Sequence, residues 1–194
     1  MQEIQASFDL LAMLATDPRT GVLIVLLVVA AISDWRSFRI PNWLTFGGAV
    51  FALACHAALD RTPLSGLGLA LGGLAFGLAI MLPAYVLGVM GAGDVKLMGM
   101  AGAFLGFSAT LHAVLWVFIV GGVAALAFAL WKRSLGRMLA NTREATEQLV
   151  LATMAGMRSG TPLASGQSVG KLPYGVCIAI GTIASVVARQ LGIA

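Results

Sequence analysis

Two aspartates stand beside apolar segments of the chain. Asp34 opens residues 34–42, DWRSFRIPN, and Asp94 lies within residues 91–97, GAGDVKL. Two adjacent carboxyl groups that share one proton can hydrolyse a peptide bond. One takes a proton from water, while the other donates a proton to the carbonyl oxygen and then to the leaving amine. Which aspartate is the acid and which the base stays open, since coupled carboxyl groups titrate as a pair.

Glycines surround the second aspartate. Gly91 and Gly93 lack a Cβ atom, so the backbone can adopt unusual dihedral angles and a substrate strand can approach closely. The alternative is an ordinary turn between two membrane spans. A nucleotide-binding loop is excluded, because neither a third glycine nor a Gly-Lys-Ser/Thr ending follows Gly93.

Two polar residues near the aspartates are candidates for supporting roles. Lys96 lies two residues from Asp94 and could favour its ionised form, or it could be a basic anchor at the membrane surface. Asn42 could hydrogen-bond the aspartate pair, or it could cap the helix that begins beside it. The sequence leaves both alternatives open for both residues.

The composition indicates a membrane protein. Of the 194 residues, 59% are apolar and 10% are charged, whereas about a quarter of the residues of an ordinary soluble domain are charged. A soluble protein of this size could not bury so much apolar surface. The net charge of +4 is explained by membrane topology, so no nucleic-acid partner is expected.

Apolar segments recur along the chain and predict an all-α, polytopic membrane fold with about six transmembrane helices. The fourth segment is short for a complete span, and Pro83 is expected to kink the third. The segments cover residues 19–33, 43–59, 64–90, 95–107, 110–131 and 172–190.

The distribution of basic residues predicts the orientation. With the N-terminus outside, nine of the twelve Lys and Arg residues fall on the cytoplasmic side, as the positive-inside rule favours. The same orientation places Asp34 and Asp94 together at the cytoplasmic face. The nine are Arg36, Arg39, Lys96, Lys132, Arg133, Arg137, Arg143, Arg158 and Lys171, and the other three are Arg19, Arg61 and Arg189.

The chain, residues 1–194, is predicted to be a single integral-membrane domain. Residues 132–171 are its long polar stretch and are expected to be cytoplasmic, with an amphipathic helix followed by a loop. Residues 4–15 are expected to form a short amphipathic helix on the surface. No secretory signal peptide is expected, because Arg19 is the one basic residue before the first apolar run.

Three motifs resemble those of the type IV prepilin peptidases. Residues 91–97 resemble the family's GxGDxKL signature, and residues 34–42 resemble its first aspartate motif, in which an Asp is followed by Arg residues and Ile-Pro-Asn. Residues 171–175, KLPYG, resemble the segment that opens the family's last helix. The resemblance covers nearly the whole chain, and it implies that the family's two catalytic aspartates are Asp34 and Asp94.

This resemblance implies an aspartyl endopeptidase in the cytoplasmic membrane of a bacterium or archaeon. The expected substrate is a prepilin-like precursor with an N-terminal hydrophobic helix, cut at the cytoplasmic face to release a short basic leader. The chain is similar to the short, peptidase-only members of Flp/tight-adherence pilus systems, since it has no N-terminal cytoplasmic region with paired cysteines. N-methylation of the product is therefore not expected, and neither is a cofactor.

Other classes of protein compete with this interpretation. A presenilin-like intramembrane protease also carries Gly-x-Gly-Asp, but its Pro-Ala-Leu motif is absent. A transporter could use the paired aspartates to bind a cation or relay protons, and a nonenzymatic subunit of a pilus machine would leave them unexplained. No metal site is expected, because His56 and His112 have no second ligand at metal spacing and Cys55 and Cys177 form no CxxC pair.

Overall fold

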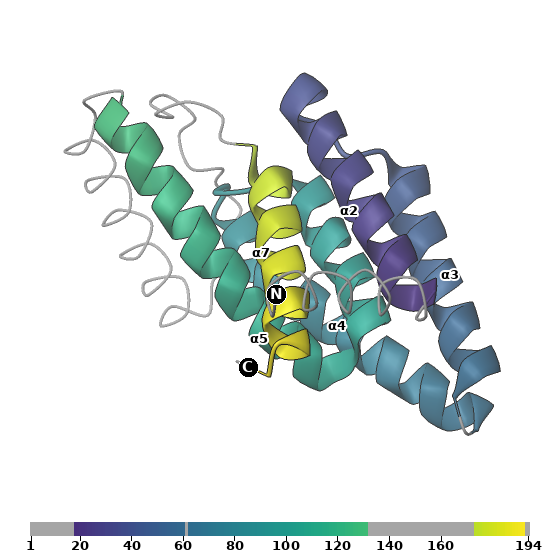
Figure 1. Cartoon of the computed structure of the whole chain (residues 1–194). Helices are drawn as coiled ribbons and strands as arrows, with labels where there is room; N and C mark the ends of the chain where they lie inside the picture. Colours follow the sequence, from purple (N-terminus) through teal and green to yellow (C-terminus); the bar gives the residue numbers. More distant parts are fainter. Residues whose placement is uncertain (1–17, 61, 132–172, 193–194) are drawn as a thin grey trace, which may run out of the picture.

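The computed structural model describes residues 18–60, 62–131 and 173–192. These residues form helices and no strand, which confirms the predicted all-α class (Figure 1). The predicted surface helix over residues 4–15 and the predicted polar segment 132–171 lie outside the described residues. In chain order the helices are α2 (Pro18–Ser37), α3 (Asn42–Leu59), α4 (Pro63–Val86), α5 (Ala92–Trp131) and α7 (Tyr174–Gln190).

The described helices include four that are long and apolar enough to cross a membrane, namely α2, α3, α4 and the Ala92–Phe128 part of α5. The fifth, α7, is apolar but has 17 residues. The predicted count of about six spans is therefore not confirmed. Two of the predicted segments, 95–107 and 110–131, correspond to the two helical parts of α5, which meet at Gly106.

The long helix α5 is broken at Gly106. A straight helix of its 40 residues would extend about 60 Å, roughly twice the hydrocarbon core of a bilayer. Gly106 has φ 74° and ψ 173°, which lies outside the helical region. Beyond it, the Thr110 hydroxyl donates to the Gly106 carbonyl oxygen at 2.6 Å and lies 3.5 Å from that of Gly102. Residues eight apart in a straight helix would be separated by about 12 Å, so the chain bends here and α5 turns back along the bundle (Figure 1).

The first segment of α5 lies at the centre of the bundle, and residues 94–104 are buried except for the partly exposed Lys96. Helix α4 approaches it closely through glycine, since a Cβ atom on Gly77 would lie 2.5 Å from the Met98 carbonyl oxygen. Small residues allow such close contact between helices in lipid. Not every glycine of α4 serves this purpose, because Gly68 and Gly72 face open space.

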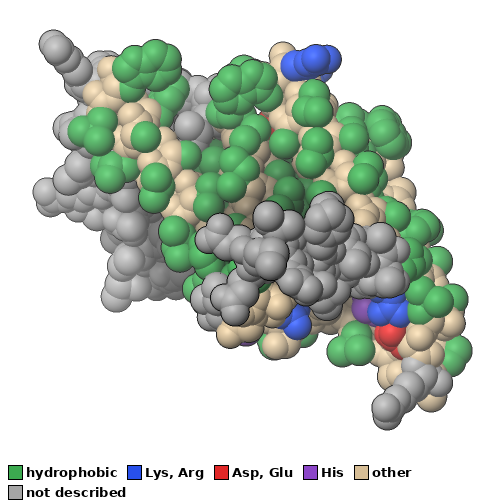
Figure 2. All heavy atoms as spheres, viewed as in Figure 1, with side chains coloured by type: hydrophobic (Ala, Val, Ile, Leu, Met, Phe, Trp, Pro, Cys, Tyr) green, Lys and Arg blue, Asp and Glu red, His purple; other side chains and the backbone are tan. Residues whose placement is uncertain are grey.

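The outer surface of the helices is apolar, as expected for contact with lipid. Large hydrophobic side chains near the middle of the helices are exposed, among them Val25, Val50, Leu69 and Ile119. Figure 2 shows these hydrophobic side chains covering the flanks of the bundle, while the charged side chains visible on this face lie toward its two ends. This pattern indicates a membrane protein.

Candidate active site

Asp34 faces the interior of the bundle because it continues the buried stripe of α2. The buried residues of this helix are Leu23, Leu27, Ala30 and Asp34, which recur at intervals of three and four and therefore lie on one helical face. The apolar members pack into the core, and the aspartate follows them one turn later. Its residue is 5% exposed.

The carboxyl group of Asp34 contacts the beginning of α7. Its Oδ2 accepts a hydrogen bond from the Gly175 N–H at 2.7 Å, although the two residues are 141 positions apart in the chain. The Val176 N–H lies near the same carboxyl group, but it donates its hydrogen bond to the Pro173 carbonyl oxygen at 3.2 Å. The last described helix therefore contributes a backbone donor to the site.

Asp94 lies in the first turn of α5 and is 8% exposed. Its Oδ2 accepts a hydrogen bond from the Gly91 N–H at 3.0 Å, and the Gly91 carbonyl oxygen accepts one from the Asp94 N–H at 3.1 Å. A side chain that reaches back to the backbone N–H three residues earlier stabilises the start of a helix. This reciprocal pair holds the Asp94 carboxyl group against the beginning of α5.

The two carboxyl groups lie close enough to interact. The charge of Asp34 acts on Asp94, and both carboxyl groups act electrostatically on the thiol of Cys177. Among the residues that the structure describes, no side chain donates a hydrogen bond to either carboxyl group, so backbone N–H groups are their protein donors. Two buried carboxyl groups near each other can share a proton and act together as acid and base.

Ile40 packs between the segments that carry the two aspartates. A Cβ atom on Gly93 would lie 3.3 Å from the Ile40 Cβ, and one on Gly175 would lie 2.9 Å from the Ile40 Cδ1. The loop that contains Ile40 is held by the Ser33 hydroxyl, which donates to the Arg39 carbonyl oxygen at 2.8 Å. Small residues at positions 93 and 175 therefore let three segments meet around one isoleucine.

Lys96 and Asn42 contact each other instead of the carboxyl groups. The Lys96 ammonium donates to Asn42 Oδ1 at 3.0 Å and lies 5.3 Å from the centre of the Phe46 ring. Asn42 also does not cap α3, whose N-cap residue is Pro41 and has no side-chain hydrogen bond. These contacts join the beginnings of α3 and α5, so both residues support the framework around Asp94.

The two predicted glycines have different surroundings. A Cβ atom on Gly91 would be in ordinary contact with Asp94 Oδ2, at 3.5 Å, so the backbone N–H of Gly91 is its main contribution. Gly93 needs to be small because of Ile40. The sequence analysis missed Ile40 and Gly175 as site residues, although both lie in the motifs that carry the resemblance. A sequence does not show which side chains pack together or which backbone N–H groups face a carboxyl group.

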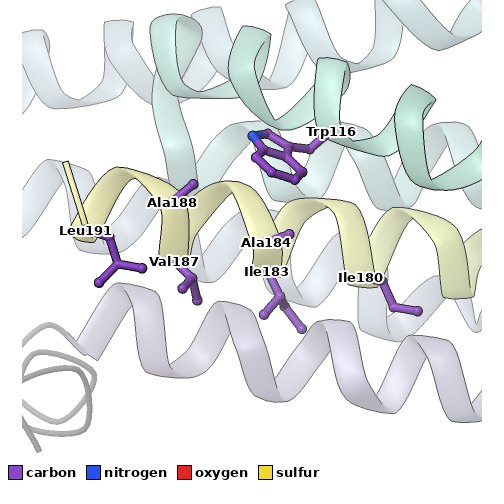
Figure 3. Close-up of a pocket in the computed structure, with 7 residues that line it drawn as sticks. All are labelled: Trp116, Ile180, Ile183, Ala184, Val187, Ala188 and Leu191. Atoms are coloured by element: carbon purple, nitrogen blue, oxygen red, sulfur yellow. The ribbon is translucent and has the colours of Figure 1, made fainter. Parts of the chain in front are cut away.

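An apolar groove of about 500 Å³ lies away from the aspartates, between α5 and α7 (Figure 3). Trp116 of α5 lines one side, and residues of α7 and its end line the rest. None of the lining side chains can act as an acid or base, so the groove offers no chemistry of its own. The other lining residues are Ile180, Ile183, Ala184, Val187 and Ala188 of α7 and Leu191, which follows its end.

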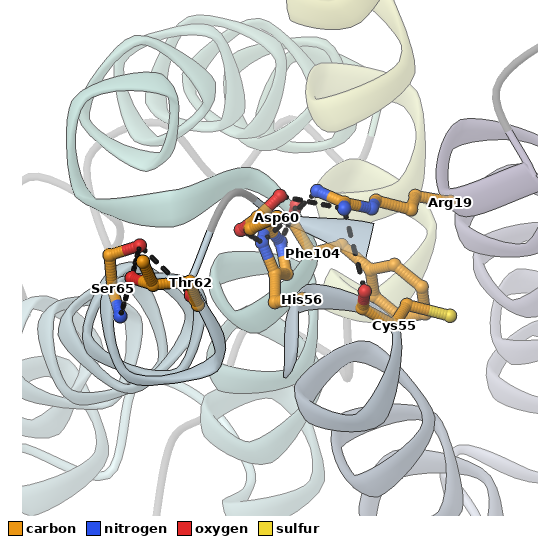
Figure 4. Close-up of polar contacts among 7 residues, drawn as sticks. All are labelled: Arg19, Cys55, His56, Asp60, Thr62, Ser65 and Phe104. Atoms are coloured by element: carbon orange, nitrogen blue, oxygen red, sulfur yellow. Dashed lines mark hydrogen bonds and ion pairs between the residues drawn. The ribbon is translucent and has the colours of Figure 1, made fainter. Parts of the chain in front are cut away.

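A second polar cluster lies at the other end of α2 and α3 (Figure 4). Arg19 forms an ion pair with Asp60 at 2.7 Å, and His56 Nδ1 lies 2.9 Å from the other Asp60 oxygen. Hydrogen bonds from His56 and Arg19 hold the pKa of Asp60 below its ordinary value of 3.8. In the described residues no group of three or more His, Cys, Asp or Glu could hold a metal ion. The contacts of this polar cluster connect the beginning of α2 to the end of α3 and stabilise the fold.

Comparison with known proteins identifies a family. The sequence model of the type IV leader peptidase family matches residues 21–126, which is more than half of the chain and includes both Asp34 and Asp94. No curated protein and no solved structure matches the chain.

Proposed function

Because the chain belongs to the type IV leader peptidase family, we propose that it is a membrane aspartyl endopeptidase that removes the leader from prepilin-like precursors. Asp34 and Asp94 are its catalytic pair. The observation that carries this proposal is that two buried carboxyl groups from different helices each accept a backbone N–H hydrogen bond, and that Gly93 beside Asp94 and Gly175 beside Asp34 both pack against Ile40. An electrostatic pair of this kind is the minimum needed for acid–base hydrolysis of a peptide bond.

The reaction needs only water and the two carboxyl groups. The ionised carboxyl group takes a proton from a water molecule, whose oxygen attacks the carbonyl carbon of the scissile peptide bond. The protonated carboxyl group donates its proton to the carbonyl oxygen, which gives a tetrahedral diol. The diol then collapses, the C–N bond breaks, and the leaving amine takes up a proton from the pair. The products are a shortened precursor and a free leader peptide.

The proposed orientation places the catalytic pair at the cytoplasmic face of a bacterial or archaeal membrane. Arg36, Arg39 and Lys96 lie at the same helix ends as the two aspartates, in support of the positive-inside rule. In this orientation the hydrophobic helix of a precursor would enter from the bilayer. Its basic leader would remain in the cytoplasm beside Asp34 and Asp94.

A cleavage assay tests this function. The chain is co-expressed with candidate prepilins, and loss of the leader is followed as a shift on a gel. Wild-type protein is expected to remove the leader, while Asp34→Asn and Asp94→Asn each abolish cleavage and still accumulate in the membrane. Asp60→Asn is the matched control, because it removes a carboxyl group at the opposite end of the bundle and should leave cleavage intact.

Two results would contradict the proposal. Cleavage by either asparagine variant at the wild-type rate would exclude the paired mechanism. If wild type cleaves none of a panel of prepilins, while Asp34→Asn and Asp94→Asn change an ion flux, the aspartates serve the alternative function of a cation- or proton-coupled transporter.

A further inference from the structure

Helix α7 begins without a capping side chain of its own. Its N-cap residue is Pro173, which makes no side-chain hydrogen bond. The first N–H groups of any helix have no partner within the helix, and a side-chain oxygen usually accepts from the second or third of them. In α7 these are the N–H groups of Gly175 and Val176. The Val176 N–H donates to the Pro173 carbonyl oxygen at 3.2 Å, whereas the Gly175 N–H donates to the carboxyl group of Asp34 in α2 at 2.7 Å.

We propose that the first turn of α7 holds the Asp34 carboxyl group in its reactive orientation, and that Gly175 is the positioning residue on which this depends. The proposal rests on the function proposed above and adds a residue to it. Asp34 caps α7 from another helix, so the hydrogen bond from the Gly175 N–H both stabilises the beginning of α7 and orients Asp34. A negative charge is favoured at this place, because the beginning of a helix carries a partial positive charge.

Position 175 accepts only glycine without moving Asp34. A Cβ atom there would lie 2.8 Å from Asp34 Oδ2, 3.0 Å from Asp34 Cβ and 2.9 Å from Ile40 Cδ1. Asp34 Oδ2 and Ile40 Cδ1 lie at the ends of side chains and can rotate away. The contact with Asp34 Cβ, which is fixed to the backbone, requires only a small shift between α2 and α7. The rotation of Asp34, however, would break its hydrogen bond to the Gly175 N–H. Gly175→Ala is therefore expected to misplace the carboxyl group in a folded protein.

Gly181 of the same helix gives the contrasting case. A Cβ atom at position 181 would lie 2.6 Å from the Val117 Cα and 2.7 Å from the Val117 nitrogen. These are backbone atoms of α5, so Gly181→Ala would force two helices apart. This variant should lower the melting temperature, and it defines the behaviour of a purely structural glycine of α7.

Steady-state cleavage of a prepilin in detergent tests the positioning role. Gly175→Ala is expected to lower kcat by about 10²-fold, the effect of misplacing a catalytic group by about 1 Å. Its KM should stay within about twofold, because the substrate helix does not depend on Asp34 for binding. Its melting temperature should stay near that of wild type. Wild-type kcat, or a loss of activity that parallels a loss of folded protein as in Gly181→Ala, would overturn the proposal.

The contribution of Ile40 is separated with a double variant. Ile40→Val removes Cδ1, so adding Gly175→Ala on this background leaves only the contact with Asp34. The second substitution should lower kcat as much on the valine background as on the wild-type one. Recovery of activity in the double variant would show that packing against Ile40 is the cause, and it would overturn the role assigned to Asp34.

Hydrogen–deuterium exchange tests the contact without catalysis. Asp34→Ala should speed exchange in a peptide that contains the Gly175 and Val176 amides. Asp34→Asn should speed it less, because an amide oxygen can still accept a hydrogen bond. Asp94→Ala should leave the exchange rate unchanged. Equal exchange in Asp34→Ala and wild type would overturn the proposal whatever the enzyme cleaves. Faster exchange in Asp34→Ala, together with no cleavage of any prepilin by wild type, would support the contact and reject only the proposed function.

Discussion

The imidazole Nε2 of His56 lies 3.1 Å from the carbonyl oxygen of Phe104, so a side chain of α3 contacts the backbone of α5 just before its break at Gly106. Carbonyl groups that precede the end of a helical segment lack partners within the helix. His56 satisfies one of them, while its other nitrogen contacts Asp60 and Arg19 (Figure 4). The polar cluster therefore joins three helices at the place where α5 turns back.

Replacement of His56 by alanine should destabilise the fold. The Phe104 carbonyl oxygen would lose its side-chain donor in a buried place, which costs about 1–3 kcal/mol. Thermal unfolding in detergent measures the change. His112→Ala is the control, because His112 Nδ1 hydrogen-bonds the Ser108 carbonyl oxygen of its own helix and, among the described residues, contacts no other helix in this way. Equal melting temperatures for the two variants would contradict the bridging role of His56.

Asp60 should make a pH-dependent contribution to stability. Hydrogen bonds from His56 and Arg19 hold the pKa of Asp60 below 3.8, the value expected in the unfolded chain. A carboxyl group with a lowered pKa stabilises the folded state above its unfolded pKa, and this contribution is lost as the pH falls through its folded pKa. The melting temperatures of wild type and Asp60→Asn should therefore differ by a constant amount just above pH 3.8 and converge below it. A difference that widens on acidification would contradict this assignment.

Neighbouring glycines of α4 should respond oppositely to a methyl group. A Cβ atom on Gly73 would lie 2.8 Å from the Gly106 Cα, whereas one on Gly72 would meet nothing within 4 Å. Gly73→Ala should lower the free energy of unfolding by about 1–3 kcal/mol, the usual cost of overpacking. Gly72→Ala should be neutral or stabilising, since alanine is favoured over glycine within a helix. A stable Gly73→Ala protein would show that α4 and α5 can separate without loss.

The break in α5 should depend on the glycine that forms it. The backbone angles of Gly106 fall in a region that is essentially limited to glycine, and another residue there costs about 1–3 kcal/mol. Gly106→Ala should therefore destabilise the protein. Gly122→Ala, in the same helix and facing open space, should be neutral or stabilising. If both variants unfold at the same temperature as wild type, the bend does not need glycine.

The sequence predicted the helical class and the family, because hydropathy and short motifs carry that information. It also predicted an interruption between residues 107 and 110, close to the observed break at Gly106. It could not show that the second segment turns back along the bundle, since apolar residues continue on both sides of the break. The Lys96–Asn42 contact was missed because it depends on the spacing of α3 and α5. The hydrogen bond from Gly175 to Asp34 was missed because the direction of a backbone N–H follows from the fold.

The order of synthesis gives the contact between α2 and α7 a further meaning. The ribosome makes Asp34 and Asp94 before it makes Gly175. A nascent chain that has inserted α2 to α5 carries both carboxyl groups and still lacks the N–H donor of α7. If Gly175 positions Asp34 as proposed, such a chain is inactive because nothing orients the Asp34 carboxyl group. Efficient cleavage is therefore expected only after α7 has been made.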